Sequence, residues 1–245
     1  MTTLRTLLRP NAASGSMQRV QARVRYLLIG AALVTLLYPL SEAGFIQAVI
    51  YLVLFCVFFG AGVAFVAINR RWAWLGLLAG TWQSLLGIMY LVEAQTRTPD
   101  TMLTVVFFAG FLIFDSIIIY ALLEFVFVEV RRMSNAVIYA AITVYILLGY
   151  MFAPAYMCIE TITQATMGTT AFMISYAPET ALYWQKFVYY SFVTLTTMGY
   201  GDIVPLTSWS QAFAALEGRA GVLYIAILIG RLVGLNSSGN AANAE

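Results

Sequence analysis

The stretch Thr196-Thr197-Met198-Gly199-Tyr200-Gly201-Asp202 organises the rest of the chain. It lies between an apolar run that contains residues 183–195 and a second apolar run that begins near Trp209. Two glycines separated by one residue are a weak signal alone, because glycine punctuates loops of every kind. The same pair within Thr-x-Gly-Tyr-Gly-Asp, placed between two apolar helices, is far more specific because the surrounding pattern must fit as well.

This stretch resembles the selectivity filter of potassium channels, whose main-chain carbonyl oxygens replace the hydration shell of the ion. Gly199 and Gly201 can adopt backbone angles closed to other residues, so that successive carbonyls can face one axis. Thr197 can add a hydroxyl oxygen at the inner mouth, and the Tyr200 ring can wedge into the surrounding protein. The resemblance implies that the filter consists of Thr197, Met198, Gly199, Tyr200 and Gly201. It also implies that K⁺ binds along the first four of these residues.

The composition is that of a membrane protein. Hydrophobic residues make up 62% of the chain and charged residues 10%, and a net charge of +2 is too small to suggest nucleic-acid binding. The chain has no histidine, the commonest metal ligand, and Cys56 and Cys158 are interpreted as buried apolar residues. No cluster of nucleophile, base and orienting group is apparent, so neither an enzyme nor a cofactor is expected.

Six apolar segments are interpreted as transmembrane helices. They span residues 26–40, 45–68, 72–92, 101–128, 135–156 and 208–235. The first is short, and the alternative is a signal peptide with a poor cleavage site at Leu40-Ser41-Glu42-Ala43; we favour a retained helix that starts a turn earlier. The polar residues before it are expected to form a mostly disordered arm.

The predicted fold is therefore an all-α membrane protein with a re-entrant pore helix and filter between the fifth and sixth helices. Four regions follow: a cytoplasmic amino-terminal arm (1–25), a four-helix transmembrane domain without an arginine-rich sensor (26–132), a pore domain (133–235) and a cytoplasmic tail (236–245).

The distribution of basic residues sets the expected orientation. With both termini in the cytoplasm, all but three of the 13 basic residues fall on the cytoplasmic side. The exceptions are Arg97, Lys186 and Arg219. This orientation places the filter at the outer face of a plasma or bacterial inner membrane.

Residues 183–196 are predicted to form a helix that enters the bilayer without crossing it. The carboxyl end of such a helix carries about half a negative charge, which would point toward the ion path. Irregular backbone at membrane depth must be buried in protein or line water. One filter segment per chain then implies a homotetramer, since the filters it resembles use four loops.

The resemblance to six-helix potassium channels covers about residues 134–235. It implies that Asp202 caps the filter and that Thr196 supports it. Tyr189 and Tyr190 fall where the family often has an aromatic cuff, and Tyr189 is predicted to hydrogen-bond to Asp202.

Two further positions are singled out by the family spacing. Val193 occupies the place where some members carry a glutamate behind the filter, so filter inactivation of the family type is in doubt. Gly221 falls where these channels often have a hinge glycine in the inner helix; the alternative is a close helix contact.

Charges within the predicted spans form a candidate network. Arg219 is expected to pair with Glu217 of a neighbouring subunit or with Asp115 across helices, either to fix packing or to act in gating. The fourth span has no basic residue, whereas each charge that crosses the field contributes about 2.3 kcal/mol per 100 mV. Steep voltage gating is therefore not expected.

These features predict a channel that conducts K⁺ passively and is weakly or not voltage-gated. A less selective monovalent cation channel is the alternative, if Met198 and Val193 relax the filter. A subunit of a potassium transporter is a further alternative, although transporters built on this pore pattern typically carry four filter-like segments in one chain.

Overall fold

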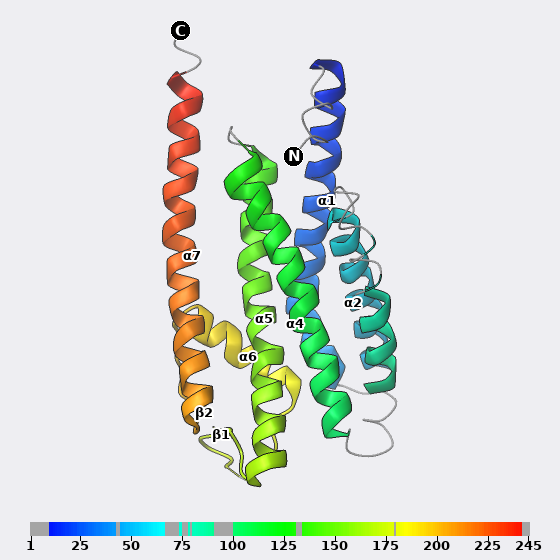
Figure 1. The fold of residues 1–245 in the computed structure, drawn as a ribbon, viewed down its shortest axis with the longest axis vertical. Helices are drawn as coiled ribbons and strands as arrows, with labels where there is room; N and C mark the ends of the chain where they lie inside the picture. Colours follow the sequence, from blue (N-terminus) through cyan, green and yellow to red (C-terminus); the bar gives the residue numbers. More distant parts are fainter. Residues whose placement is uncertain are drawn as a thin grey trace.

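The computed structural model describes residues 10–42, 45–66, 74, 78, 80–90, 100–130, 134–178 and 180–241. In these residues the chain is mostly helical, with one two-stranded sheet (Figure 1). The elements are α1 (Pro10–Leu37), η2 (Tyr38–Glu42), α2 (Phe45–Val66), α4 (Thr101–Glu124), η3 (Phe125–Glu129), α5 (Asn135–Met167), β1 (Phe172–Ile174), α6 (Trp184–Leu195), β2 (Ile203–Pro205) and α7 (Ser208–Ala241).

Within the described residues, four helices are long and apolar enough to cross a membrane: Val20–Ser41, Thr101–Val128, Asn135–Met167 and Ser208–Leu235. The predicted second span coincides with α2, which holds a shorter apolar helix, Val49–Phe65. In the predicted third span, residues 80–90 are helical, and most of the remainder lies outside the described residues. The six-span arrangement therefore stays a prediction.

The first helix begins earlier than the sequence suggested. Because α1 starts at Pro10, the expectation of a mostly disordered arm is wrong for residues 10–25. Proline suits the first turn of a helix, where its missing N–H is not needed. Gln21, Ala22 and Arg23 are strong helix formers that continue it into the apolar segment.

The fifth helix ends later than predicted. It was expected over residues 135–156, but α5 continues through Pro154 to Met167, about three turns further. Pro154, the stop signal that the sequence offers, is accommodated inside the helix. The helix ends at Gly168, whose left-handed backbone (φ 66°) stops it and whose N–H donates to the Gln164 carbonyl. The residues that follow the predicted fifth span, up to Met167, are therefore helix.

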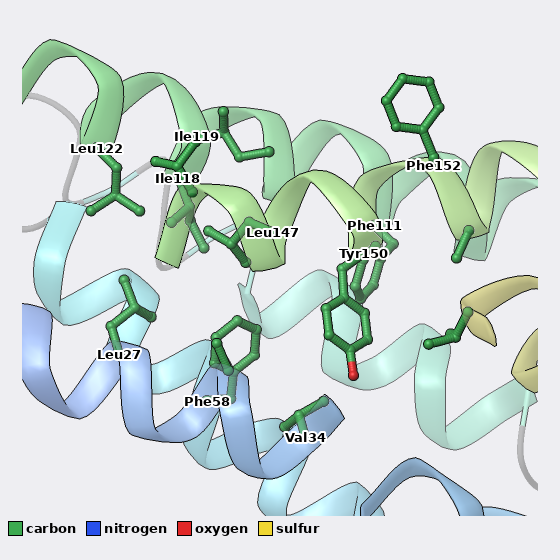
Figure 2. Close-up of a cluster of buried hydrophobic side chains, with 14 of the residues drawn as sticks. Leu27, Val34, Phe58, Phe111, Ile118, Ile119, Leu122, Leu147, Tyr150 and Phe152 are labelled. Atoms are coloured by element: carbon green, nitrogen blue, oxygen red, sulfur yellow. The ribbon is translucent and has the colours of Figure 1, made fainter. Parts of the chain in front are cut away.

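The core lies between α1, α2, α4 and α5. Figure 2 shows Leu27 of α1, Phe58 of α2, Ile118 of α4 and Leu147 of α5 in one buried cluster. Aromatic stacking adds to this packing, with the rings of Phe59 and Phe114 4.3 Å apart and almost parallel. The last element of α4, the π-helical turn η3, is also buried in part, since Val126 has no exposed surface.

The two ends of the bundle differ. The start of α1 and the end of α7 lie at the same end, which is uppermost in Figure 1, and the β1–β2 sheet lies at the other. The strands pair antiparallel, with Met173 opposite Val204. Because α6 lies between β1 and β2 in the chain, the backbone leaves the sheet end of the bundle and returns to it.

Helix α7 is packed on one side only. In its most apolar window 17% of the residues are buried, against 61% for α5. Large apolar side chains are exposed along it: Leu216, Val222, Leu223, Ile225, Ile227, Ile229 and Val233. A continuous apolar surface of this kind is typical of contact with lipid or with another protein chain.

Candidate pore site

The short helix α6 occupies the predicted position. It runs from Trp184 to Leu195 with Tyr183 and Thr196 as its caps, which confirms a helix over residues 183–196. It lies obliquely between α5 and α7 (Figure 1). Phe187 and Ser191, which have no exposed surface, hold it in the protein.

Main-chain amides of the filter stretch donate hydrogen bonds to carbonyls at the carboxyl end of α6. The N–H of Thr197 donates to the Thr194 carbonyl (2.9 Å), and the N–H groups of Met198 and Gly199 donate to the Val193 carbonyl (3.0 and 3.4 Å). These bonds satisfy carbonyls that a helix end otherwise leaves unpaired. Because of these bonds, the amides of Thr197, Met198 and Gly199 face α6.

The backbone of the stretch alternates in handedness. Thr197, Gly199 and Gly201 have φ of 58°, 58° and 74°, whereas Met198 and Tyr200 have negative φ. Alternation of this kind gathers successive N–H groups on one side of the chain and carbonyls on the other. A positive φ is uncommon for threonine and is typical of a functional constraint. The sequence predicted special backbone angles at Gly199 and Gly201, but it did not predict the positive φ of Thr197.

The side chains of the filter stretch are not enclosed by the chain itself. Met198 is 61% exposed and Tyr200 66% exposed. The predicted wedging of the Tyr200 ring into surrounding protein is therefore not found within one chain. No heavy atom lies within 4 Å of a Cβ built on Gly199 or Gly201, so this part of the backbone faces open space.

Hydrogen bonds fix the outer end of the stretch. The predicted bond is present: the Tyr189 hydroxyl donates to Asp202 Oδ2 at 2.7 Å, while the Ile203 N–H donates to Oδ1 at 3.0 Å. Ser175, which the sequence did not single out, donates through Oγ to the Gly201 carbonyl (2.7 Å) and through its N–H to the Asp202 carbonyl (2.8 Å). Ser175, directly after β1, thus holds the exit of the filter stretch where the chain enters β2.

Unlike Tyr189, the side chains of Tyr190 and Thr196 do not contact the outer end of the filter stretch through any hydrogen bond in the described residues. The Tyr190 ring is buried, with centroids 5.0 Å from Tyr156 and 5.5 Å from Phe172. It anchors α6 to α5 and β1. The Thr196 hydroxyl donates back to the Phe192 carbonyl (2.6 Å). Their predicted role as filter support stays a prediction.

Behind the filter, the carboxyl group comes from α7 and not from α6. Val193, the position where some potassium channels carry a glutamate, is buried. Glu217 of α7 contacts Ser191, which lies two residues before Val193 on α6. Glu217 has no exposed surface, and its second oxygen accepts from the Tyr156 hydroxyl of α5. Sequence spacing alone could not bring Tyr156, Ser191 and Glu217 together.

Within one chain, the described residues do not join the three predicted membrane charges, and a network between subunits stays a prediction. Among the described residues, neither a hydrogen bond nor an ion pair joins Asp115, Glu217 and Arg219. Asp115 is buried, and its Oδ2 has no partner in this part of the chain. Arg219 is exposed and its Nε donates to the Ala215 carbonyl one turn earlier (3.0 Å). Pairing of Arg219 with a neighbour's Glu217 is also disfavoured, because each Glu217 is covered within its own chain.

Gly221 makes a close helix contact. A Cβ at this position would lie 2.3 Å from the Leu195 carbonyl oxygen, at the end of α6. Helix α7 continues unbroken through Gly221, so its small size lets α7 approach α6 closely. The structure thus displays the packing role, and the hinge stays a prediction.

The helices and the site together define a membrane protein with a short helix and an irregular segment inserted between two long helices. Residues 156–237 match a family model described as "Ion channel". The match begins in α5 and takes in α6, the filter stretch and nearly all of α7 up to residue 237. The match supports passive ion conduction through this part of the chain and relates it to the cation channel superfamily. Neither a curated protein nor a solved structure matches the chain.

Proposed function

We propose that the chain is one subunit of a homotetrameric channel that conducts K⁺ selectively and passively. The observation that carries the proposal is the alternating backbone of residues 197–201, in which the amides of Thr197, Met198 and Gly199 bond to carbonyls of α6. Carbonyls gathered on the opposite side would be free to replace the hydration shell of a permeant ion. In this proposal K⁺ binds along Thr197, Met198, Gly199 and Tyr200.

A tetramer is part of the proposal because one chain leaves the site open. Met198 and Tyr200 are exposed, and so is the apolar surface of α7 beside them. Backbone at membrane depth needs protein or water around it, and several copies about one axis would supply both. Native mass spectrometry of the detergent-solubilised protein is expected to give four copies per particle.

The proposed orientation places both termini in the cytoplasm and the filter outside. The basic residues favour it, and it is compatible with a bundle in which the start of α1 and the end of α7 share one end (Figure 1). Helix α4 has no lysine or arginine, so voltage is not expected to open the channel steeply.

The experiment compares two glycine variants in planar bilayers. Gly199→Ala places a Cβ at φ 58° in the filter stretch, and Gly168→Ala places one at φ 66° at the end of α5. Both cost about 1–2 kcal/mol of backbone strain, so they are matched for destabilisation. Currents through the wild type and through Gly168→Ala are expected to reverse near the equilibrium potential of K⁺. Gly199→Ala is expected to lose the K⁺-selective current. Selective current in Gly199→Ala equal to that of the control would overturn the proposal.

A less selective cation channel is the second candidate. It is favoured by the exposed Met198 and by Val193, which leaves no carboxyl on α6 behind the filter. Reversal potentials in opposed K⁺ and Na⁺ gradients separate the two, because a less selective pore reverses near zero. Flux that requires an ion gradient or ATP would instead indicate a transporter.

A further inference from the structure

Glu217 joins three helices at one buried point. Its carboxyl group lies on α7, the Tyr156 hydroxyl donates to Oε2 from α5, and Ser191 contacts Oε1 from α6. The three residues that join the helices are all buried: Glu217, Tyr156 and Ser191 each have no exposed surface. The contact therefore lies wholly inside the protein.

Counting hydrogen atoms at Ser191 reveals the protonation of the carboxyl group. Ser191 Oγ also lies 2.6 Å from the carbonyl oxygen of Gly149 on α5. A carbonyl can only accept, and a hydroxyl has one hydrogen to give, so Ser191 cannot donate to both Gly149 and Glu217. Both contacts of Ser191 Oγ are hydrogen bonds when Ser191 donates to Gly149 and Glu217 supplies the hydrogen of the second. The arrangement is therefore fully satisfied by a neutral carboxylic acid at Glu217.

The surroundings agree with a neutral acid. The titratable groups that face Glu217 are Tyr145 and Tyr156 of α5 and Tyr190 of α6. None of these is a cation, and the nearest arginine along α7, Arg219, is exposed and bound to its own helix. A buried carboxylate without a cation is costly, whereas the acid form satisfies both of its oxygens.

We propose that Glu217 is a positioning residue of the pore, a protonated acid that fastens the inner helix α7 to the pore helix α6 and lowers channel open probability when it loses its proton. Ionisation removes the hydrogen that bonds to Ser191 and leaves two oxygens facing each other. Since Val193 and Thr194 of α6 hold the filter amides, a shift of α6 reaches the filter directly. The gating part rests on the proposed function; the protonation part does not.

Infrared spectroscopy tests the protonation independently of conduction. At neutral pH the wild type is expected to show the C=O band of a protonated carboxyl group that Glu217→Gln loses. Asp115→Asn is the control, because Asp115, like Glu160 of α5, is another buried acid of the membrane helices. A spectrum of Glu217→Gln identical to the wild type would overturn the proposal, and so would a band lost only in Asp115→Asn.

Open probability against pH in planar bilayers tests the gating. Above the midpoint of the titration, the wild type is expected to lose open probability by up to about tenfold per pH unit, as a single proton site allows. Glu217→Gln is expected to keep its open probability at alkaline pH, because an amide donates to Ser191 and accepts from Tyr156 without titrating. Glu217→Leu, which can do neither, is expected to have low open probability at every pH.

The outcomes are distinguishable. Equal pH profiles in the wild type and Glu217→Gln would overturn the gating role while leaving the channel intact. Absence of K⁺-selective current from the wild type would instead refute the proposed function, and the infrared result would still report the proton on Glu217.

Discussion

The guanidinium group of Arg231 on α7 donates to the main-chain carbonyl of Val130 at 2.7 Å, across a sequence separation of 101 residues. Its Nε also lies 3.4 Å from the Val126 carbonyl. Both acceptors belong to the π-helical end of α4, where carbonyls lack partners within the helix. The inner helix of the candidate pore is thereby joined to the fourth helix at the end opposite the filter.

Replacement of Arg231 is expected to loosen this joint. Arg231→Met removes charged donors to two carbonyls, each worth about 1.5–3 kcal/mol at most, and should speed hydrogen exchange around residues 126–130 and 231–235. Arg231→Lys is the matched control, since it keeps the charge but cannot span both carbonyls in the same way. Exchange in Arg231→Met equal to that of the wild type would show that the joint contributes nothing to local stability.

Two glycines on the same helix should respond differently to alanine. Gly221→Ala would place a Cβ 2.3 Å from the Leu195 carbonyl oxygen, whereas at Gly218 the nearest atom, the Thr194 oxygen, lies at 3.7 Å. We expect Gly221→Ala to lower the free energy of unfolding by about 1–3 kcal/mol through forced separation of α6 and α7. Gly218→Ala should be neutral or gain up to about 1 kcal/mol of helix propensity. Unfolding in mixed detergents measures both, and equal effects would contradict the close contact.

Asp115 and Glu217, two of the buried acids, should also respond differently. Asp115 Oδ2 has no partner among the described residues, whereas both oxygens of Glu217 are bonded. Asp115→Leu is expected to raise the free energy of unfolding by about 1–3 kcal/mol, because an unsatisfied polar group leaves the interior. Glu217→Leu is expected to lower it, because the hydroxyls of Tyr156 and Ser191 lose their partner. Destabilisation by Asp115→Leu would show that this carboxyl has a partner outside the described residues.

Loss of the Tyr189 hydroxyl should free the outer end of the filter stretch. Tyr189→Phe removes the 2.7 Å bond to Asp202. A hydrogen bond to a charged group is worth about 1.5–3 kcal/mol, so local exchange near Ile203 should rise about tenfold or more. Tyr183→Phe is the control because its side chain is 65% exposed. An equal change in both variants would argue against a specific role for the bond.

Local signals in the sequence were sufficient for the elements next to the filter. The limits of α6 follow from the apolar run before the filter stretch, and the bond from Tyr189 to Asp202 was implied by the resemblance to potassium channels. Helix ends were predicted less well, because α1 and α5 extend beyond their apolar segments into residues of mixed polarity and mixed helix propensity. Apolar length marks where a helix could be in lipid, and not where it stops.

Contacts between distant segments could not be predicted. Arg219 was expected to pair with an acid, since charges in a membrane usually do. Glu217 instead met two hydroxyls, Tyr156 at a separation of 61 residues and Ser191 at a separation of 26. Nothing in the sequence distinguishes these hydroxyls from the many others in the chain. Only the packing of α5, α6 and α7 selects them.

The shared contact of Tyr156, Ser191 and Glu217 has an evolutionary consequence. A change at any one of the three leaves a buried polar group unpaired at another, and the cost of such a group falls on the whole fold. Single substitutions should therefore be rare at these positions in related chains. The three should be inherited together or replaced together by apolar residues, although they lie on three separate helices.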